Sequence, residues 1–181
     1  MSITLIVGPM YSGKSTTLLT YEKKFKACNK SYILINHSFD TRYTEDGNIC
    51  THDGVKCLGN SYTCESLFTL LENEEIIDKI NRTDCVIIDE GQFFEELEEF
   101  CTFLAESGKN IVVAGLSGNY KKEPFDSISD LMACADKIIQ LVSNCSVCGA
   151  DAPFTKRISD EKEDIVVGGS DKYEPRCRKC F

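Results

Sequence analysis

The sequence predicts an α/β fold in which helices cover both faces of a mostly parallel sheet, followed by a small cysteine-rich domain. Short apolar runs alternate with helical patterns over most of the chain, and such runs are typical of parallel strands buried on both faces. The first run ends in a glycine-containing turn that opens a helix. From residue 143 onward the pattern changes to cysteines, turns and charge. We therefore expect one domain at 1–142 and a second at 143–181.

The elements of the first domain follow one another in a regular order. Five short apolar runs are predicted as strands: residues 3–7, 32–35, 84–88, 110–115 and 138–142. Four segments carry helical patterns: residues 15–27, 65–80, 95–107 and 127–135. The polar, irregular stretch 40–63 predicts a long loop of functional importance. Phe94, Phe100 and Phe103 are expected in the core, because aromatic side chains dominate protein cores.

The composition indicates a globular protein that is soluble and intracellular, with the cytoplasm as its expected location. Among 181 residues, 29 acidic side chains outnumber 20 basic ones and give a net charge of −9. This excess argues against binding nucleic acid through bulk charge. Apolar runs stay far below the ~18 residues of a membrane span, and the first residues lack the pattern of a signal peptide. We expect neither a membrane nor a nucleic-acid partner.

A phosphate-binding loop is the strongest motif. Residues 8–15 read GPMYSGKS, which fits G-x-x-x-x-G-K-[ST] between a strand and a helix. Backbone N–H groups of such a loop hold phosphate oxygens at the start of the helix. Lys14 would supply positive charge to the terminal phosphates, and the Ser15 hydroxyl is placed to ligate Mg²⁺. The predicted nucleotide-binding residues of this P-loop are Gly8, Pro9, Met10, Tyr11, Ser12, Gly13, Lys14, Ser15 and Thr16.

Two adjacent acidic residues, Asp89 and Glu90, follow the apolar run at 86–88. The end of such a strand is where a P-loop enzyme keeps the carboxylate that organises Mg²⁺. We interpret Asp89 as the residue that orients metal-bound water, and Glu90 as a general base that faces a substrate hydroxyl. Two acids at a strand end are by themselves more often solvated charges. The P-loop in the same chain favours the functional interpretation.

Four of the 11 cysteines form two C-x-x-C pairs, Cys145 with Cys148 and Cys177 with Cys180. Two such pairs predict a tetrahedral zinc site, which would be structural because no coordination position stays open. A redox dithiol is less favoured, because neither pair begins a helix after a strand. Zinc would fix both ends of the intervening loop, which could then fold over a ligand. The other cysteines are scattered, and those in apolar surroundings, such as Cys85, are expected to act as small hydrophobes.

Taken together, the motifs resemble those of the type II thymidine kinases, the zinc-containing class of animals, many bacteria and large DNA viruses. The resemblance runs from about residue 4 to residue 181. It rests on GPMYSGKST (8–16), DTRY (40–43), CTHD (50–53), IDEGQFF (88–94), GLSGNYKKEPF (115–125), TKR (155–157) and GGSDKY (168–173). It implies a P-loop fold with a zinc-bound lasso or lid, a homotetramer, and feedback inhibition by thymidine triphosphate.

The resemblance also implies an activity. This is the phosphorylation of the 5′-hydroxyl of thymidine, or of deoxyuridine, in nucleotide salvage, with ATP as donor and with Mg²⁺ and structural Zn²⁺ as cofactors. The implied catalytic residues are Lys14, Glu90 and Arg42. Arg42 resembles the arginine that stabilises negative charge on the transferred phosphoryl group, where a cation has a clear electrostatic purpose.

In this family the thymine base lies in an apolar pocket and is held by main-chain atoms of the lid. The matching positions are Met10, Phe93, Leu116, Tyr120, Phe125, Thr155, Val166, Gly168 and Tyr173. A few residues depart from the family pattern. Tyr120 stands where many relatives carry Phe, Asp164 takes a lid position that is usually apolar, and Asn36-His37 replaces a Lys-Tyr pair. These departures leave the nucleoside preference open.

The residues by themselves are also compatible with three other functions. A P-loop ATPase or regulator would turn over ATP without a nucleoside acceptor. A zinc-ribbon protein that binds nucleic acid would use basic residues near its knuckles, where Lys172, Arg176, Arg178 and Lys179 cluster. A kinase with a shifted nucleoside preference is the third alternative, because the sequence does not give the pocket's distances.

Overall fold

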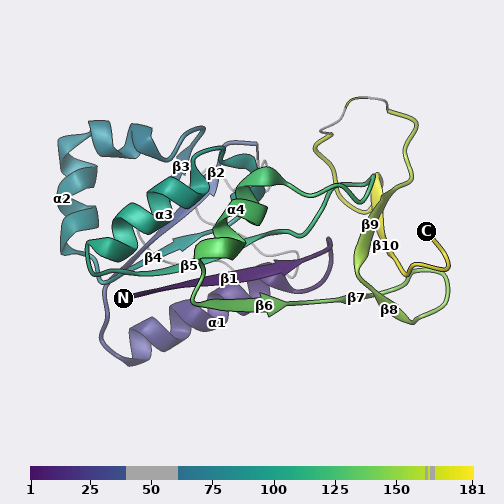
Figure 1. Ribbon diagram of the computed structural model, residues 1–181, viewed down its shortest axis with the longest axis horizontal. Coiled ribbons are helices and arrows are strands. Elements are labelled where there is room, and N and C mark those ends of the chain that lie inside the picture. Colours follow the sequence, from purple (N-terminus) through teal and green to yellow (C-terminus); the bar gives the residue numbers. More distant parts are fainter. Residues whose placement is uncertain (40–60, 162, 164–165) are drawn as a thin grey trace.

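The computed structural model describes residues 1–39, 61–161, 163 and 166–181. A six-stranded sheet with strand order β3-β2-β4-β5-β1-β6 forms its centre (Figure 1). Neighbouring strands of this sheet pair in parallel throughout. Its strands are β1 Ser2–Gly8, β2 Tyr32–His37, β3 Ser61–Cys64, β4 Cys85–Ile88, β5 Asn110–Leu116 and β6 Lys137–Gln140. The predicted parallel α/β fold is confirmed.

Helices cover both faces of the sheet, as the sequence predicts. Helix α1 (Lys14–Ala27) lies on one face, and the other helices lie on the opposite face (Figure 1). These are η1 Phe68–Glu72, α2 Glu74–Arg82, η2 Gly91–Phe93, α3 Leu97–Glu106 and α4 Asp126–Cys134, where η denotes a short 3₁₀ helix.

The alternation of strand side chains divides the core into two clusters, one for each face. The cluster under α1 is built around Leu18, Ile87 and Val112. The larger cluster under α3 and α4 includes Phe94 and Phe100, both with 0% exposure. Side chains of alternating strand residues point to opposite faces, so one short strand supplies both clusters.

A smaller lobe follows the sheet and contains two short antiparallel pairs, β7 with β8 and β9 with β10 (Figure 1). Their bounds are β7 Ser143–Asn144, β8 Asp151–Ala152, β9 Phe154–Arg157 and β10 Tyr173–Arg176. We call residues 143–181 the cysteine lobe. Its separate small cluster of buried residues consists of Cys145, Ala152 and Cys177. The lobe therefore has little apolar core apart from its own cysteines.

Three expectations from the sequence are wrong. The predicted loop at 40–63 contains the start of β3, whose residues 61–64 form an edge strand beside β2, while residues 40–60 lie outside the described part. The predicted helix at 65–80 is split at Asn73, whose side chain accepts from the N–H groups of Glu75 and Ile76 and caps α2. Phe103 is 50% exposed, because it lies off the buried stripe of α3.

Scattered cysteines in the core behave as small hydrophobes. Cys85 and Cys101 are fully buried, and burial raises the pKa of both thiols. Burial also raises the pKa of the Cys64 thiol to about 12. Such thiols stay protonated and are poor nucleophiles. No helix in the described part of the chain has the length and apolar character to span a membrane.

Candidate active site

The P-loop connects the buried strand β1 to the first turn of α1. Two residues take left-handed backbone conformations, Tyr11 with φ of 63° and Gly13 with φ of 81°. The second is cheap only for glycine. The Ser12 hydroxyl donates to the Pro9 carbonyl at 2.8 Å and tightens the turn. The Lys14 ammonium donates to the same carbonyl at 2.8 Å, so its charge lies against the loop at the positive end of the helix dipole.

Asp89 and Ser15 meet across the edge of the sheet. Asp89 follows β4 and is 2% exposed, and Ser15 lies in the first turn of α1. The Ser15 hydroxyl donates to Asp89 Oδ2 at 3.0 Å. A buried carboxylate requires such a partner. One hydroxyl and one carboxylate oxygen at this spacing are hard ligands of the kind that Mg²⁺ prefers, so these residues fit the predicted metal.

Glu90 occupies a strained position next to this pair. Its φ of 52° lies in the left-handed region, which is uncommon for a residue with a side chain. Its N–H donates to Asp89 Oδ1 at 3.0 Å, and its Oε2 accepts from Gln92 Nε2 at 2.7 Å. Such strain is found preferentially at functional sites. The sequence analysis predicts a role for Glu90 but none for its partner Gln92, although both belong to the IDEGQFF motif.

Two hydrogen bonds join the P-loop to the cysteine lobe. The N–H of Met10 donates to Thr155 Oγ1 at 2.9 Å, and the Ser143 hydroxyl donates to the carbonyl of Tyr11 at 3.0 Å. Met10 and Thr155 are both predicted pocket residues, and the structure brings them together. A displacement of the lobe would therefore break or distort hydrogen bonds to the main chain of the phosphate-binding loop.

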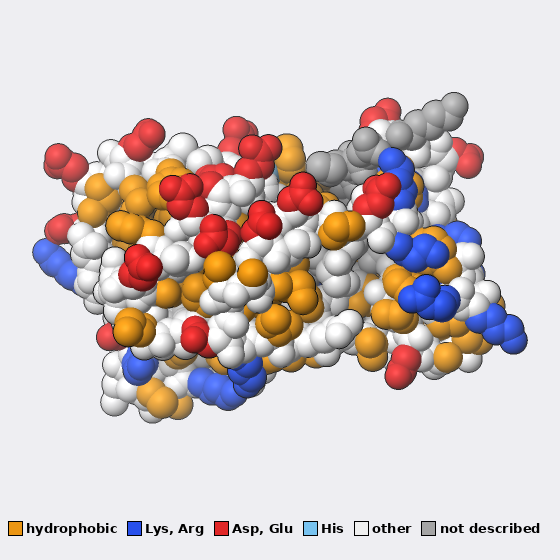
Figure 2. All heavy atoms as spheres, in the orientation of Figure 1, with side chains coloured by type: hydrophobic (Ala, Val, Ile, Leu, Met, Phe, Trp, Pro, Cys, Tyr) orange, Lys and Arg blue, Asp and Glu red, His pale blue; other side chains and the backbone are white. Residues whose placement is uncertain are grey.

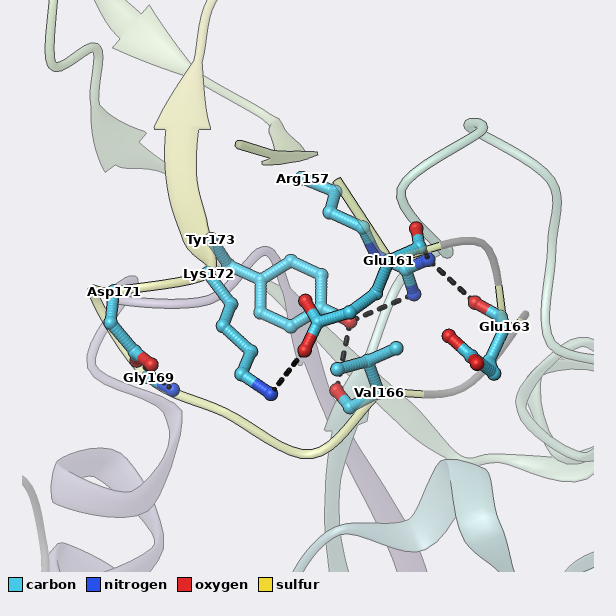
Figure 3. A network of polar contacts seen from close by, with 8 residues as sticks. All are labelled: Arg157, Glu161, Glu163, Val166, Gly169, Asp171, Lys172 and Tyr173. Carbon is cyan, nitrogen blue, oxygen red and sulfur yellow. Dashed lines mark hydrogen bonds and ion pairs between the residues drawn. The ribbon is translucent and has the colours of Figure 1, made fainter. Parts of the chain in front are cut away.

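Arg157 organises the loop between β9 and β10 (Figure 3). Its guanidinium is buried and donates to the carbonyls of Glu161 and Glu163, and to the Tyr173 hydroxyl at 2.9 Å. That hydroxyl donates in turn to the carbonyl of Val166 at 2.8 Å. Figure 3 shows these groups converging from both sides of the loop. Arg157 belongs to the TKR motif, from which no role for its side chain is predicted.

The same guanidinium joins a third predicted pocket residue to this network. Its central carbon lies 3.7 Å from the centre of the Tyr120 ring, which is a close stacking contact. Tyr120 and Tyr173 thus contact one buried cation, and Val166 is joined to it through the Tyr173 hydroxyl. The extra hydroxyl that distinguishes Tyr120 from phenylalanine sits on a ring held by this stack.

The remaining predicted pocket residues occupy different surroundings. Phe93 packs near the ring of His37, at 5.5 Å between centroids. Leu116 ends β5, and Phe125 precedes α4 and packs against the larger core cluster. A side chain at Gly168 would meet Lys172, since a Cβ there would lie 2.4 Å from Lys172 Cδ. Arg42 and Asp164 lie outside the described residues.

The four cysteines of the two C-x-x-C pairs form one cluster. Their sulfur atoms all lie within 4.8 Å of one another, and those of Cys148 and Cys177 are 3.6 Å apart. Thiolates around one tetrahedral zinc ion are separated by about 3.8 Å, given Zn–S bonds of about 2.3 Å. A backbone hydrogen bond from Cys177 lowers the pKa of the Cys145 thiol to about 6. The cluster therefore fits Zn²⁺, which thiolates bind.

The charges near this cluster are partly neutralised within the lobe. Lys and Arg side chains gather over the lobe, whereas acidic side chains gather over α3 and α4 on the same face (Figure 2). Arg176 forms an ion pair with Glu174 and donates to the carbonyl of Cys180. Lys122 lies 3.8 Å from the centre of the Phe181 ring, and Arg178 lies 4.9 Å from that of Phe154. These cations have structural partners, which weakens the zinc-ribbon alternative.

The loop, the buried Asp89 and the parallel sheet define a P-loop nucleotide-binding protein. Solved structures with this fold include the flagellar accessory protein FlaH from Methanocaldococcus jannaschii, with a TM-score of 0.55 and 14% identity over 83% of this chain and 74% of that chain. The genome packaging NTPase B204 from Sulfolobus turreted icosahedral virus 2 has a TM-score of 0.53 and 19% identity, covering 77% of this chain and 74% of its own. At these identities the similarity shows the fold alone.

Sequence relatives identify the family. The thymidine kinase family profile matches residues 1–181. The thymidine kinase of Choristoneura biennis entomopoxvirus is 42% identical over all of this chain and 96% of its own length. The cytosolic thymidine kinase of Homo sapiens is 37% identical over 99% of this chain and 72% of its own length. The chain belongs to the thymidine kinase family, and it is a kinase that uses ATP and a small-molecule substrate.

Removal of one zinc ligand is expected to unfold the cysteine lobe while leaving the sheet intact. Cys148→Ser should reduce bound zinc from about one ion per chain to a small fraction. Because two hydrogen bonds join the lobe to the P-loop, kinase activity should fall as well. Metal analysis and circular dichroism would measure this, with the exposed Cys134→Ser as the matched control. Full zinc binding by Cys148→Ser would contradict the four-cysteine site.

His37 is a buried neutral side chain at the end of β2. Its Nδ1 accepts from the N–H of Phe39 at 3.1 Å, and its Nε2 lies 3.2 Å from the carbonyl of Glu65. The second contact requires a proton on Nε2, so these partners assign the neutral tautomer. The rings of Phe93 and Phe94 pack against it. Burial lowers the pKa of His37 below its usual value.

This lowered pKa predicts a loss of stability in mild acid. The unfolded chain binds a proton at His37 as the pH falls through about 6.5, while the folded chain resists it. The free energy of unfolding should therefore fall from about pH 6.5 down to the folded pKa. In His37→Phe the curve should start lower, because two hydrogen bonds are lost, but fall less steeply. Urea denaturation between pH 7.5 and 5.5 measures this, and parallel curves for the two proteins would refute it.

Proposed function

We propose that this chain transfers the γ-phosphoryl group of ATP to the 5′-hydroxyl of thymidine, and of deoxyuridine, to give the monophosphate. The observation that carries the proposal is the meeting of Ser15 and Asp89 at 3.0 Å, with Glu90 as the next residue. A phosphate-binding loop, a metal-organising acid and a second acid are the parts that phosphoryl transfer to a hydroxyl requires. Family membership supports thymidine as the acceptor.

The phosphate side of the reaction is assigned to the P-loop. Gly8 to Thr16 would cradle the ATP phosphates, and Lys14 would place its charge on the terminal ones. Mg²⁺, when bound, neutralises charge on the β- and γ-phosphates. The Ser15 hydroxyl is positioned to ligate the ion, and Asp89 to orient its water ligands. Asp89 is already held for this task, because its backbone N–H donates to the carbonyl of Ile35 at 3.0 Å.

Proton transfer is assigned to Glu90. As general base it would accept the proton of the 5′-hydroxyl while the oxygen attacks the γ-phosphorus, an effect commonly worth about 10²–10⁴-fold in rate. The family resemblance supports Arg42 as the cation that stabilises charge on the transferred group. A base next to the metal-organising acid places the proton acceptor and the phosphates at the same edge of the sheet.

The nucleoside side is assigned to residues around Thr155 and Arg157. Met10 and Thr155 are in contact, and Tyr120 and Tyr173 are held by the Arg157 guanidinium. The Tyr173 hydroxyl fixes the carbonyl of Val166, a main-chain group in the loop that the family uses to hold the base. Base selection would then depend on the shape of this loop. The resemblance further supports a cytoplasmic homotetramer whose product enters nucleotide salvage, with 1–142 and 143–181 as its two domains.

A nucleoside panel tests the reaction. With ATP and Mg²⁺, a coupled assay should show phosphorylation of thymidine and deoxyuridine, and none of deoxycytidine or deoxyguanosine. A reaction without nucleoside serves as the control for simple ATP hydrolysis. Hydrolysis that is unaffected by any nucleoside would replace the kinase with an ATPase built on the same loop. Turnover of a purine nucleoside or of deoxycytidine would show a shifted preference.

Loss of the Tyr173 hydroxyl should weaken thymidine binding. Tyr173→Phe removes the bond from Arg157 and the bond to the carbonyl of Val166. Such losses cost about 1–2 kcal/mol, so the KM for thymidine should rise about 5- to 30-fold. The KM for ATP should stay within about 2-fold. Glu161→Gln, which removes the charge of the partly exposed pair with Lys172 and leaves the Tyr173 hydroxyl in place, is the matched control with about 2-fold effect or less. Equal effects of the two variants would contradict the pocket assignment.

A further inference from the structure

Gln92 is a buried amide in the turn that follows Glu90. It lies in η2 and is 6% exposed. A buried amide requires partners for its oxygen and its NH₂ group. The turn also holds its main chain, because the hydroxyl of the buried Ser127 in α4 lies 3.4 Å from the carbonyl of Gln92. The amide oxygen and NH₂ group must therefore find their partners among the groups that surround this turn.

The orientation of this amide is determined by a backbone group. The N–H of Leu116, at the end of β5, lies 2.9 Å from Gln92 Oε1. A backbone N–H can only donate, so the oxygen of the amide must face β5 and its NH₂ group must face the other way. Gln92 Nε2 accordingly donates to Glu90 Oε2 at 2.7 Å. The amide connects the main chain of β5 with the carboxylate that we assign as the base.

This arrangement requires a small residue in β5. A Cβ at Gly115 would lie 3.2 Å from Gln92 Oε1 and 2.5 Å from Ile128 Cδ1. A side chain at this position would clash with Ile128 and press on the amide oxygen that accepts from the N–H of Leu116. Gly115 thus allows β5, η2 and α4 to pack closely around the side chain of Gln92.

The chemistry of an amide suits a base. A carboxylate has about four lone-pair sites, so one bond from Gln92 leaves acceptor capacity for a substrate hydroxyl. A lysine or arginine at this position would favour the charged form strongly and weaken the base. A neutral donor orients the carboxylate without that cost. Glu90, with its left-handed φ of 52°, stands two residues before the amide that donates to it.

We propose that Gln92 is the positioning residue of the general base, which it aims at the acceptor hydroxyl from the main chain of β5. The inference rests on the proposed function, since it presupposes that Glu90 accepts the proton. It adds a residue that does not touch the transferred phosphoryl group and acts through Glu90. It also gives the end of β5 a positioning role, because the N–H of Leu116 determines the orientation of the Gln92 amide.

Gln92→Glu provides the sharpest test. The new side chain retains an oxygen for the N–H of Leu116 but replaces the donor with a carboxylate facing Glu90. Two adjacent carboxylates do not ionise together, which raises the pKa of one of them. The acidic limb of the pH–rate profile should therefore move up by about one unit or more, so that kcat at a pH on that limb falls by about 10-fold or more. Activity should recover as the pH rises, and the KM for ATP should stay within about 3-fold.

Two further variants separate the outcomes. Ser127→Ala disturbs the same buried turn without touching the amide, and its pH profile should match that of the parent protein. Glu90→Gln should lose about 10²-fold or more in kcat at every pH. If Glu90→Gln retains its kcat, the proposed base is wrong, whatever Gln92 does. If Glu90→Gln is inactive and Gln92→Glu shows an unshifted profile, only the positioning role of Gln92 is refuted.

Thermal unfolding accompanies each measurement. A melting temperature for Gln92→Glu close to that of Ser127→Ala, together with the shifted profile, would support the proposal. A rise in the KM for thymidine without a change in the profile would instead make Gln92 a pocket residue and overturn the inference. Should Gln92→Glu fail to fold, Gln92→Met decides the question. This variant should lose kcat with the KM for thymidine within about 3-fold, and an unchanged kcat would refute the role.

Discussion

Parallel pairing of β1 and β4 on either side of β5 is the constraint on which the site depends. Gly8 of β1 pairs with Leu116, and Ile88 of β4 pairs with Val113. Parallel strands all end at the same edge, so a phosphate-binding loop and an acid 74 residues away meet without any help from loops. The residues just after these strands are therefore close together. They bring the hydroxyl of Ser15, the carboxylates of Asp89 and Glu90, and the amide of Gln92 into one site.

The cysteine lobe extends this rigid edge toward the acceptor. It touches the P-loop through side chains of Ser143 and Thr155, which bind main-chain groups. Arg157 then holds the loop between β9 and β10 through carbonyls, so its shape depends on one buried cation. In this arrangement a zinc ion held by the four cysteines would stand apart from the chemistry. It would secure the ends of a loop whose interior is organised by Arg157.

Much of the fold could be predicted from the sequence, and its errors have local causes. The P-loop and the strand before Asp89 could be predicted because each depends on interactions between residues that are close together in the sequence. β3 was missed because it is a polar edge strand with one neighbour, and the helix break was missed because Asn73 offers a cap that periodicity does not show. Gln92 and Arg157 have main-chain partners, which no pattern of side chains reveals. The partner of Gln92 lies 24 residues away, and those of Arg157 are carbonyls of the irregular loop that follows it.

The scarcity of apolar core in the cysteine lobe has a consequence for how this part of the chain can evolve. The sheet is packed on both faces, so each of its buried positions restricts the volume of its neighbours. The hydrophobic cluster of the lobe is small and consists of Cys145, Ala152 and Cys177, while Thr155 and Arg157 are buried through polar contacts. Exposed positions of the lobe, such as Val147 and Ile158, are not under this restriction. Substitutions at such positions should therefore cost less packing energy than substitutions in the sheet, so the loop could change in sequence while its anchors hold its ends.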